Sequence, residues 1–302
     1  MSEASGSRHS VGYVPEVTPG VTPATPVFKK LRHNTTSLNL SKASFQSNEL
    51  RDDRQIADFR HGTRSAAGNV VGELSASSYD DMLQAALGGT WVADVLKAGI
   101  VRRSFTLERR FSDVNQFMRY RGAEVDSLQL AMGTGGVVAL TMGFWAMGMD
   151  VASAIVTGAT YTDAPITAPM DALTGEVTEG GSPIAVVTSV NLNLSNGMNP
   201  RFVIGSAESL QASIGRSNLT GTMDAYFEDV SLYNKFINEE TSSLSVQATD
   251  GDNIYTFLVP KLKYTGGDVP VAGEGPISIA MPFQAMKDPT LGTNIQITRV
   301  LA

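Results

Sequence analysis

The stretch SLQLAMGTGGVVALTMGFWAMGM, residues 127–149, has no charged side chain, although an aspartate flanks it on each side. Its length would allow a membrane-spanning helix, which needs about 20 consecutive apolar residues. However, three glycines interrupt the stretch between residues 133 and 136. Clustered glycines are typical of turns and destabilise helices. We therefore favour two strands joined by a turn over a membrane span.

Apolar residues alternate with small or polar residues on both sides of these glycines. Before them, every second residue from 128 to 132 is Leu or Met. After them, every second residue from 138 to 144 is Val, Leu, Met or Phe. A two-residue period is that of a strand with one buried face. The pattern predicts a β-hairpin with its turn at Gly133–Gly136.

Similar short alternating segments, separated by Gly, Asp and Asn, recur along the chain. They predict a mainly antiparallel β protein. The clearest of them are residues 105–107, 117–120, 244–247 and 254–259.

Helix signals are few. The strongest predicts a helix over Tyr79–Leu87, where Ser77 or Ser78 can cap the first turn and Gly88 can end the last. A second short helix candidate covers Val230–Phe236.

The sequence contains a short internal repeat, which we call an echo. GVVALTMGFWAM (136–147) corresponds to GPISIAMPFQAM (275–286), with Met, Phe, Ala and Met at matching positions. The offset between the two segments is constant at 139 residues.

A second echo precedes the first in each half. NVVGELSA (69–76) corresponds to NLTGTMDA (218–225), an offset of 149 residues that aligns Gly72 with Gly221. A helix candidate follows each copy. Two echoes in the same order predict a duplicated domain.

We therefore divide the chain into four parts. Residues 1–27 form an extended N-terminal arm, because its prolines favour extended backbone. The copies of the domain are residues 28–150 and 183–302. Between them, residues 151–182 are rich in Ala, Thr, Gly and Pro without a sustained period, which is typical of a linker.

Composition narrows the class of protein. With 42% hydrophobic and 18% charged residues the chain is globular, and without cysteine it has no disulfides or thiolate metal sites. Residues 1–26 lack the apolar core of a signal peptide, so we expect synthesis in a cytosol.

Charge is distributed unevenly. Up to Arg121 the chain has 16 basic and 12 acidic side chains, and afterwards 7 and 18. The basic residues around Lys29 and Arg102 could form a nucleic-acid surface. Acids such as Glu108 and Asp113 lie among them, a mixture more typical of solvated or interface charges.

No arrangement of residues predicts an active site. The three histidines, His9, His33 and His61, are not at the spacing of metal ligands. The glycines at 133–136 lack the Lys and Ser/Thr of a phosphate loop. We therefore expect no catalytic residue, no cofactor and no metal.

Acidic pairs could in principle serve as catalytic carboxylates, but no base or nucleophile accompanies them. A hydrolase is thus the weakest hypothesis. The pairs are Asp80-Asp81, Glu228-Asp229 and Glu239-Glu240.

The chain resembles a known family, the tail tube (major tail) proteins of bacteriophages with long, non-contractile tails. The resemblance covers nearly the whole sequence. It is densest at residues 49–87, 104–132, 199–236 and 276–299.

The resemblance implies a fold and an assembly. Each domain would be an antiparallel β-sandwich with a flanking helix, and inner-sheet strands of neighbours would join into a continuous barrel. Stacked rings of such barrels make a hollow tube that conducts viral DNA. Most members form hexameric rings of single domains, so two tandem domains imply a homotrimeric ring with pseudo-sixfold symmetry; a hexameric ring is the alternative.

The resemblance also implies contacts between rings. The loop between the second and third strands of each domain would contact the adjacent ring, at about residues 54–69 in the first copy and 201–218 in the second. The candidate contact residues are Arg54, Arg60, Arg64, Arg201 and Arg216.

The leading hypothesis is thus a non-enzymatic structural virion protein, made in the host bacterial cytoplasm and located in the tail. Its expected partners are copies of itself and the tail terminator, tail tip and tape measure proteins. DNA would pass through the lumen without sequence-specific binding, and no membrane would be involved. The alternative is a monomeric two-domain β-sandwich adhesin, which predicts an exposed aromatic cluster; the only tryptophans are Trp91 and Trp145.

Overall fold

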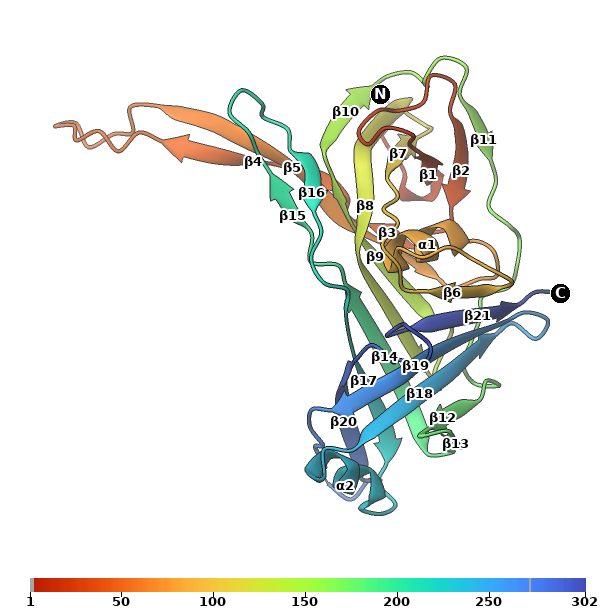
Figure 1. The fold of residues 1–302 in the computed structure, drawn as a ribbon. Coiled ribbons are helices and arrows are strands. Elements are labelled where there is room, and N and C mark those ends of the chain that lie inside the picture. Colours follow the sequence, from red (N-terminus) through yellow and green to blue (C-terminus); the bar gives the residue numbers. More distant parts are fainter. Residues whose placement is uncertain (1–2, 272) are drawn as a thin grey trace.

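The computed structural model describes residues 3–271 and 273–302. Half of the chain is strand and 6% is helix, so the predicted mainly β class is confirmed. Figure 1 shows an elongated molecule with strands running through both halves and one long hairpin projecting from the upper half. No helix within these residues is long and apolar enough to span a membrane.

The strands and helices have the following bounds. The first half contains a 3-10 helix (Gly6–Arg8), β1 (His9–Pro15), β2 (Val27–Leu31), β3 (Thr35–Thr36), β4 (Asn39–Gln46), β5 (Phe59–Glu73), α1 (Asp80–Leu87), β6 (Val95–Lys97), β7 (Phe105–Phe111), β8 (Gln116–Gly133), β9 (Ala139–Ala146) and β10 (Gly148–Ala152). The second half contains β11 (Thr160–Thr162), β12 (Val177–Glu179), β13 (Ser182–Pro183), β14 (Val187–Ser195), β15 (Asn199–Arg201), β16 (Leu210–Ser213), β17 (Asn218–Tyr226), α2 (Ser231–Ile237), β18 (Thr241–Thr249), β19 (Ile254–Tyr264), β20 (Ser278–Ala285) and β21 (Gln296–Val300).

The uncharged stretch that opens the sequence forms the predicted hairpin. Leu130 of β8 faces Leu140 of β9, and the turn lies between Gly133 and Ala139. β8 is longer than the alternation predicted. Its first half pairs with β7 and β10, and its second half pairs with β9 and β14.

A central antiparallel sheet runs through both halves of the molecule. Its strands lie in the order β5, β9, β8, β14, β17 and β20. β8 and β14 join the part built by the first half of the chain to the part built by the second. We call this β8–β14 junction the internal seam.

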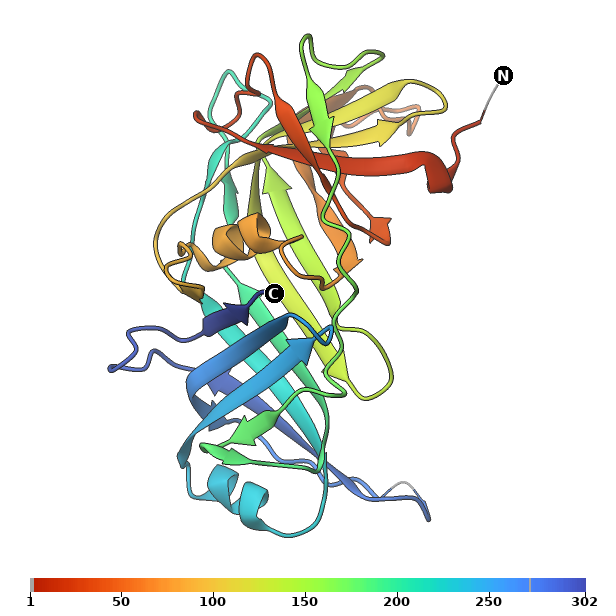
Figure 2. The same cartoon turned by 90° about the vertical axis from the view of Figure 1, so that its right-hand side faces the viewer.

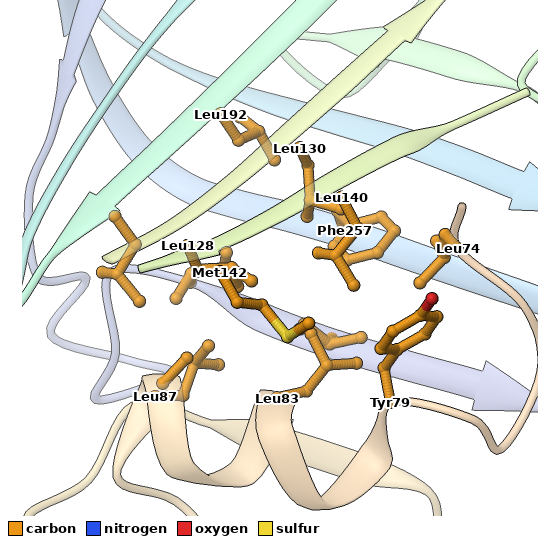
Figure 3. Close-up of a cluster of buried hydrophobic side chains, with 14 of the residues drawn as sticks. Leu74, Tyr79, Leu83, Leu87, Leu128, Leu130, Leu140, Met142, Leu192 and Phe257 are labelled. Atoms are coloured by element: carbon orange, nitrogen blue, oxygen red, sulfur yellow. The ribbon is translucent and has the colours of Figure 1, made fainter. Parts of the chain in front are cut away.

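Helix α1 covers one face of this sheet. Figure 3 shows Leu83 and Leu87 of α1 pointing toward Leu128, Met142 and their neighbours on β8 and β9. These side chains are at most 3% exposed. Burying each large aliphatic side chain contributes about 1.5–3 kcal/mol, which holds α1 on the sheet.

The ends of α1 match the sequence prediction only in part. Gly88 adopts a left-handed conformation (φ 64°) after the last turn, as expected for a terminating glycine. The predicted serine cap is wrong, because the helix begins after Tyr79 and no side chain caps it. Ser78 instead donates its hydroxyl to the carbonyl of Ala76.

Residues assigned to the N-terminal arm and to the linker also form strands. β1 pairs with β2 and β7. β11 pairs in parallel with β2, and β12 pairs with β18. In Figure 2 the segment from β11 to β12 runs along the molecule from its upper to its lower part. Residues 151–182 thus contribute strands to both halves.

The strands that carry the two sequence echoes occupy corresponding places in the sheet, but the second echo is displaced by four residues. Gly68 of β5 faces Phe144 of β9, and Gly221 of β17 faces Phe283 of β20. The sequence alignment had matched Gly221 with Gly72, four residues further along β5. The strand pairing, which fixes which residues lie side by side, therefore matches Gly221 with Gly68.

Candidate interaction surfaces

The first candidate surface is the hairpin formed by β4 and the beginning of β5. Pairing continues to its end, where Gln46 faces Phe59. Figure 1 shows this hairpin projecting away from the body of the molecule. Along it, Phe45 is 63% exposed and Leu50 is 99% exposed. Apolar side chains gathered on a projecting element indicate a contact with a partner.

The second candidate surface is the smaller β15–β16 hairpin. Its loop carries Val203 and Ile204, of which Ile204 is completely exposed. It lies beside the first hairpin in Figure 1, and the backbone N–H of Arg64 donates to the carbonyl of Ala207 at 2.7 Å. The two hairpins thus form one joined projection.

The structure places four of the five predicted contact arginines on these hairpins. Arg54 lies in the loop of the β4–β5 hairpin and Arg60 on β5, where its side chain is 81% exposed and ion-paired with Asp58. Arg64 is exposed at the point where the two hairpins join. Their inter-ring role remains a prediction.

Arg201 and Arg216 have different surroundings. The guanidinium of Arg201 donates twice to the carbonyl of Gln211, at 2.9 and 2.7 Å, and so fastens the two strands of its own hairpin. Arg216 is exposed between β16 and β17, at the base of the hairpin. The five arginines therefore do not form a single cluster.

A buried ionic network that the sequence did not reveal anchors the second hairpin. Glu124 of β8 is 3% exposed and accepts hydrogen bonds from Arg102 at 2.7 Å and from Gln211 at 2.6 Å. Arg102 also donates to the carbonyl of Ala212. These partners are up to 110 residues apart in sequence, so spacing could not identify them. They hold the base of β16 against β8.

The uncovered face of the central sheet is polar but almost uncharged. Side chains on this face alternate with the buried ones, and Gln129 and Asn193 are exposed. From residue 127 of β8 through β9, β14, β17 and β20, the one charged side chain on this face is Asp224, which accepts a hydrogen bond from Ser189 at 2.6 Å. The face consists mainly of hydroxyl, amide and small groups.

His9 and His33, which the sequence did not pair, lie in contact. Arg109 donates to Nε2 of His9 at 3.2 Å, so neutral His9 carries its proton on Nδ1. That proton is donated to Nε2 of His33 at 2.9 Å, and Nδ1 of His33 donates to the carbonyl of Leu31. Burial, reinforced by the charge of Arg109, lowers the pKa of His9 to about 4. Burial also lowers the pKa of His33.

The tryptophans do not form the aromatic cluster that an adhesin would need. Trp145 is 8% exposed. Trp91 is half-buried, and the guanidinium of Arg299 lies 4.3 Å from its ring centroid. In the part of the chain that the structure describes, no three His, Asp or Glu side chains are grouped as metal ligands.

A family model described as phage tail tube protein matches residues 6–285. The chain belongs to the phage tail tube protein family. No curated protein matches the sequence. Family membership makes the chain a structural protein of the phage tail, consistent with its mainly β fold.

The tail tube family is structural and non-enzymatic. Its members assemble with copies of themselves and with other tail components. In this family member, exposed apolar side chains occur on the joined hairpins. The free face of the central sheet is polar from residue 127 of β8 through β9, β14, β17 and β20, with Asp224 as its one charged side chain there.

Proposed function

We propose that this protein is the tube subunit itself, which polymerises into stacked rings and forms the conduit for viral DNA during ejection. The proposal is supported by the two different faces of the central sheet. One of its faces is buried under α1 and the core, while the other is polar and uncovered. Such a sheet suits the wall of a hollow tube, with its polar face toward the lumen.

The polar face also suits the passage of DNA. A protein holds DNA mainly through Lys and Arg contacts to phosphate. From residue 127 of β8 through β9, β14, β17 and β20, no basic side chain lies on this face, and Asp224 would repel phosphate. DNA in such a lumen would slide without sequence-specific binding.

We infer that the chain is a tandem duplication and that three chains close a ring with pseudo-sixfold symmetry. The equivalence of Gly68 and Gly221 supports the duplication. A Cβ on Gly68 would lie 2.5 Å from the carbonyl of Ser37, and a Cβ on Gly221 would lie 2.4 Å from that of Asn191. Both glycines therefore allow the same close approach of neighbouring strands. A ring of six chains is the alternative.

The joined hairpins would make the contact between rings. Exposed apolar residues such as Leu50 and Ile204 would be buried against the adjacent ring. Arg54, Arg60 and Arg64 would face acidic surface there. The tail terminator, tail tip and tape measure proteins would be further partners in the virion tail, after synthesis in the host cytoplasm.

Electron microscopy of the purified protein tests this function. We expect rings or tubes in negative stain, with threefold or pseudo-sixfold end views. Native mass spectrometry of single rings would give three chains, whereas six would replace the trimer by the hexamer. A protein that stays monomeric at high concentration, even with tail initiator components, would exclude the tube function.

A further inference from the structure

The internal seam shows how the edges of the two halves fit together. β8 and β14 pair antiparallel, with Leu128 facing Leu194 and Leu130 facing Leu192. These four side chains are 2–3% exposed. The seam is thus a strand ladder with a buried apolar face.

The edge that β14 contributes to the seam has a counterpart in the first half. Asn193-Leu194-Ser195 of β14 matches Asn39-Leu40-Ser41 of β4, an offset of 154 residues. The close approaches of the two glycines give the same offset, because they involve the carbonyls of Ser37 and Asn191. Residues 189–195 of β14 therefore correspond to residues 35–41.

The edge that β8 contributes has a counterpart in the second half. Gln129 faces Thr141 across the β8–β9 hairpin, and Asp268 forms a bridge with Ala280. Both residues of the second pair follow those of the first by 139 positions. The end of β8 therefore corresponds to residues 266–271, the segment that follows β19.

Both counterpart edges lack a strand partner within the described chain. β3 and β4 pair with β5 on one side only. Asp268 exchanges backbone hydrogen bonds with Ala280 at 3.1 and 2.9 Å, so the backbone groups of Gly267 and Val269 point to the opposite, open side. The backbone groups of Pro270 have the same orientation as those of Asp268. The N–H group that proline lacks would therefore not have been a donor on the open edge.

Several side chains at these edges are also incompletely covered, although Leu38 is 1% exposed. Val271 is 72% exposed, and Val269 and Leu40 are partly buried against the core. Their counterparts in the internal seam, Met132, Leu130 and Leu194, are each 2% exposed. A second strand at each open edge would complete the apolar cover, as β14 does for β8.

We propose that residues 266–271 of one chain pair antiparallel with residues 36–41 of the next copy, in the register of the internal seam. The proposal rests on the tube function, since it supplies the contact that closes a ring. Transfer of the seam register gives three facing pairs. They are Leu40 with Gly267, Leu38 with Val269 and Thr36 with Val271.

The carbonyl of Leu38 affects how strongly residues 36–41 could pair with a neighbour. The carbonyl of Leu38 already accepts hydrogen bonds from Tyr120 at 2.8 Å and Arg109 at 2.7 Å. The ladder would therefore be weakest at Leu38 and strongest at its two ends, Leu40 and Thr36. Tyr120 and Arg109 would in turn fix this edge in place before a neighbour arrives.

The absence of cysteine from the sequence permits a clean crosslinking test. Asn39 and Asp268 are exposed, and the proposed register places them opposite each other in a pair without backbone hydrogen bonds. The Cα atoms of such pairs lie about 4.5 Å apart, within the range for a disulfide. The test variant is Asn39→Cys with Asp268→Cys.

A matched control exists in the internal seam. Asn193 faces Gln129 there, both side chains are exposed, and they are the counterparts of Asn39 and Asp268. Asn193→Cys with Gln129→Cys should form a disulfide within one chain. A second control, Asn39→Cys with Gly266→Cys, shifts the proposed register by two residues.

Assembled particles are oxidised and analysed on non-reducing gels, with electron microscopy of the same samples. We expect the test variant to give covalent multiples of the chain, at least tenfold more than the shifted control, while the internal control stays at the mass of one chain. Tubes without crosslinks above the shifted control would refute the proposed register and leave the tube function intact. The absence of tubes in every variant and in the unsubstituted protein would refute both.

Discussion

Arg299 of β21 is ion-paired with Asp80 at the start of α1, so a residue near the end of the chain holds a helix from its first half. Tyr255 also donates to Asp80, at 2.7 Å. The side chains of Arg299 and Asp80 are 18% and 17% exposed. The pair is therefore a link between the two halves rather than a surface ion pair.

Replacing this arginine should weaken the whole fold. In Arg299→Ala, Asp80 would keep its burial but lose its cation, which we expect to cost about 2–3 kcal/mol of unfolding free energy. Urea unfolding of the unassembled protein measures this loss of unfolding free energy. Arg60→Ala, which removes an exposed ion pair with Asp58, should cost less than about 0.5 kcal/mol. Equal effects of the two variants would contradict a link at Asp80.

The contact between His9 and His33 predicts a pH dependence. Both pKa values are lowered in the folded protein, that of His9 to about 4, so the unfolded chain takes up protons first as the pH falls. The stabilising contribution of the neutral pair is complete above about pH 6.5 and is lost as the pH falls toward 4. The free energy of unfolding should therefore be lower at pH 5 than at pH 7.

Substitution separates this effect from other titrations. His9→Gln with His33→Gln should reduce the difference in unfolding free energy between pH 7 and pH 5. His61→Gln, which replaces an exposed histidine outside this contact, is the control variant. An unchanged difference in the double variant would show that the pair does not control the pH response.

The two matched glycines predict losses of stability on substitution. An alanine Cβ would lie 2.5 Å from a backbone carbonyl at Gly68 and 2.4 Å at Gly221, so Gly68→Ala and Gly221→Ala should each cost at least about 1–3 kcal/mol. The larger loss is expected at Gly68, because its φ of 149° is also strained for alanine. A Cβ at Gly135 meets nothing within 4 Å, and Gly135→Ala is the control. Thermal unfolding of the three variants measures their losses of stability. A neutral effect at either matched glycine would weaken the case for equivalent strands.

The hairpin tips predict a separation of folding from assembly. Ile204→Asp places a charge on a completely exposed residue of the β15–β16 loop, so the unfolding free energy should change by less than about 0.5 kcal/mol. Tube yield, measured by sedimentation and electron microscopy, should fall at least tenfold. Ile166→Asp, at an equally exposed position away from the hairpins, should leave tube yield unchanged. A normal yield from Ile204→Asp would exclude this tip from the stacking contact.

Periodicity predicted the parts of the fold in which one face of a strand is buried. Leu128 to Met132 and Leu140 to Phe144 alternate over enough residues to identify β8 and β9, and the pairing of Leu130 with Leu140 confirms the hairpin. β11 escaped prediction because three residues cannot show a period and its partner, β2, is more than 130 residues away. Segments of that kind become strands only through tertiary contacts.

The interaction surfaces were less predictable. The resemblance drew attention to Arg60 and Arg64, which lie on the projecting hairpin. It did not reveal that Arg201 bonds the carbonyl of Gln211 within its own hairpin, or that buried Glu124 gathers Arg102 and Gln211. Hydrogen-bond partners of this kind depend on strand pairing, which a single sequence does not encode as spacing.

The hydrogen bond from Arg64 to Ala207 limits how the proposed rings could stack on one another. Because it joins the two hairpins of a chain, each chain presents one docking unit instead of two independent ones. The proposed ring of three chains would have three such units, although six domains would surround its lumen. Successive rings could dock in three rotational settings, 120° apart. The outside of the proposed tube would then have threefold symmetry, whereas its lumen would be nearly sixfold.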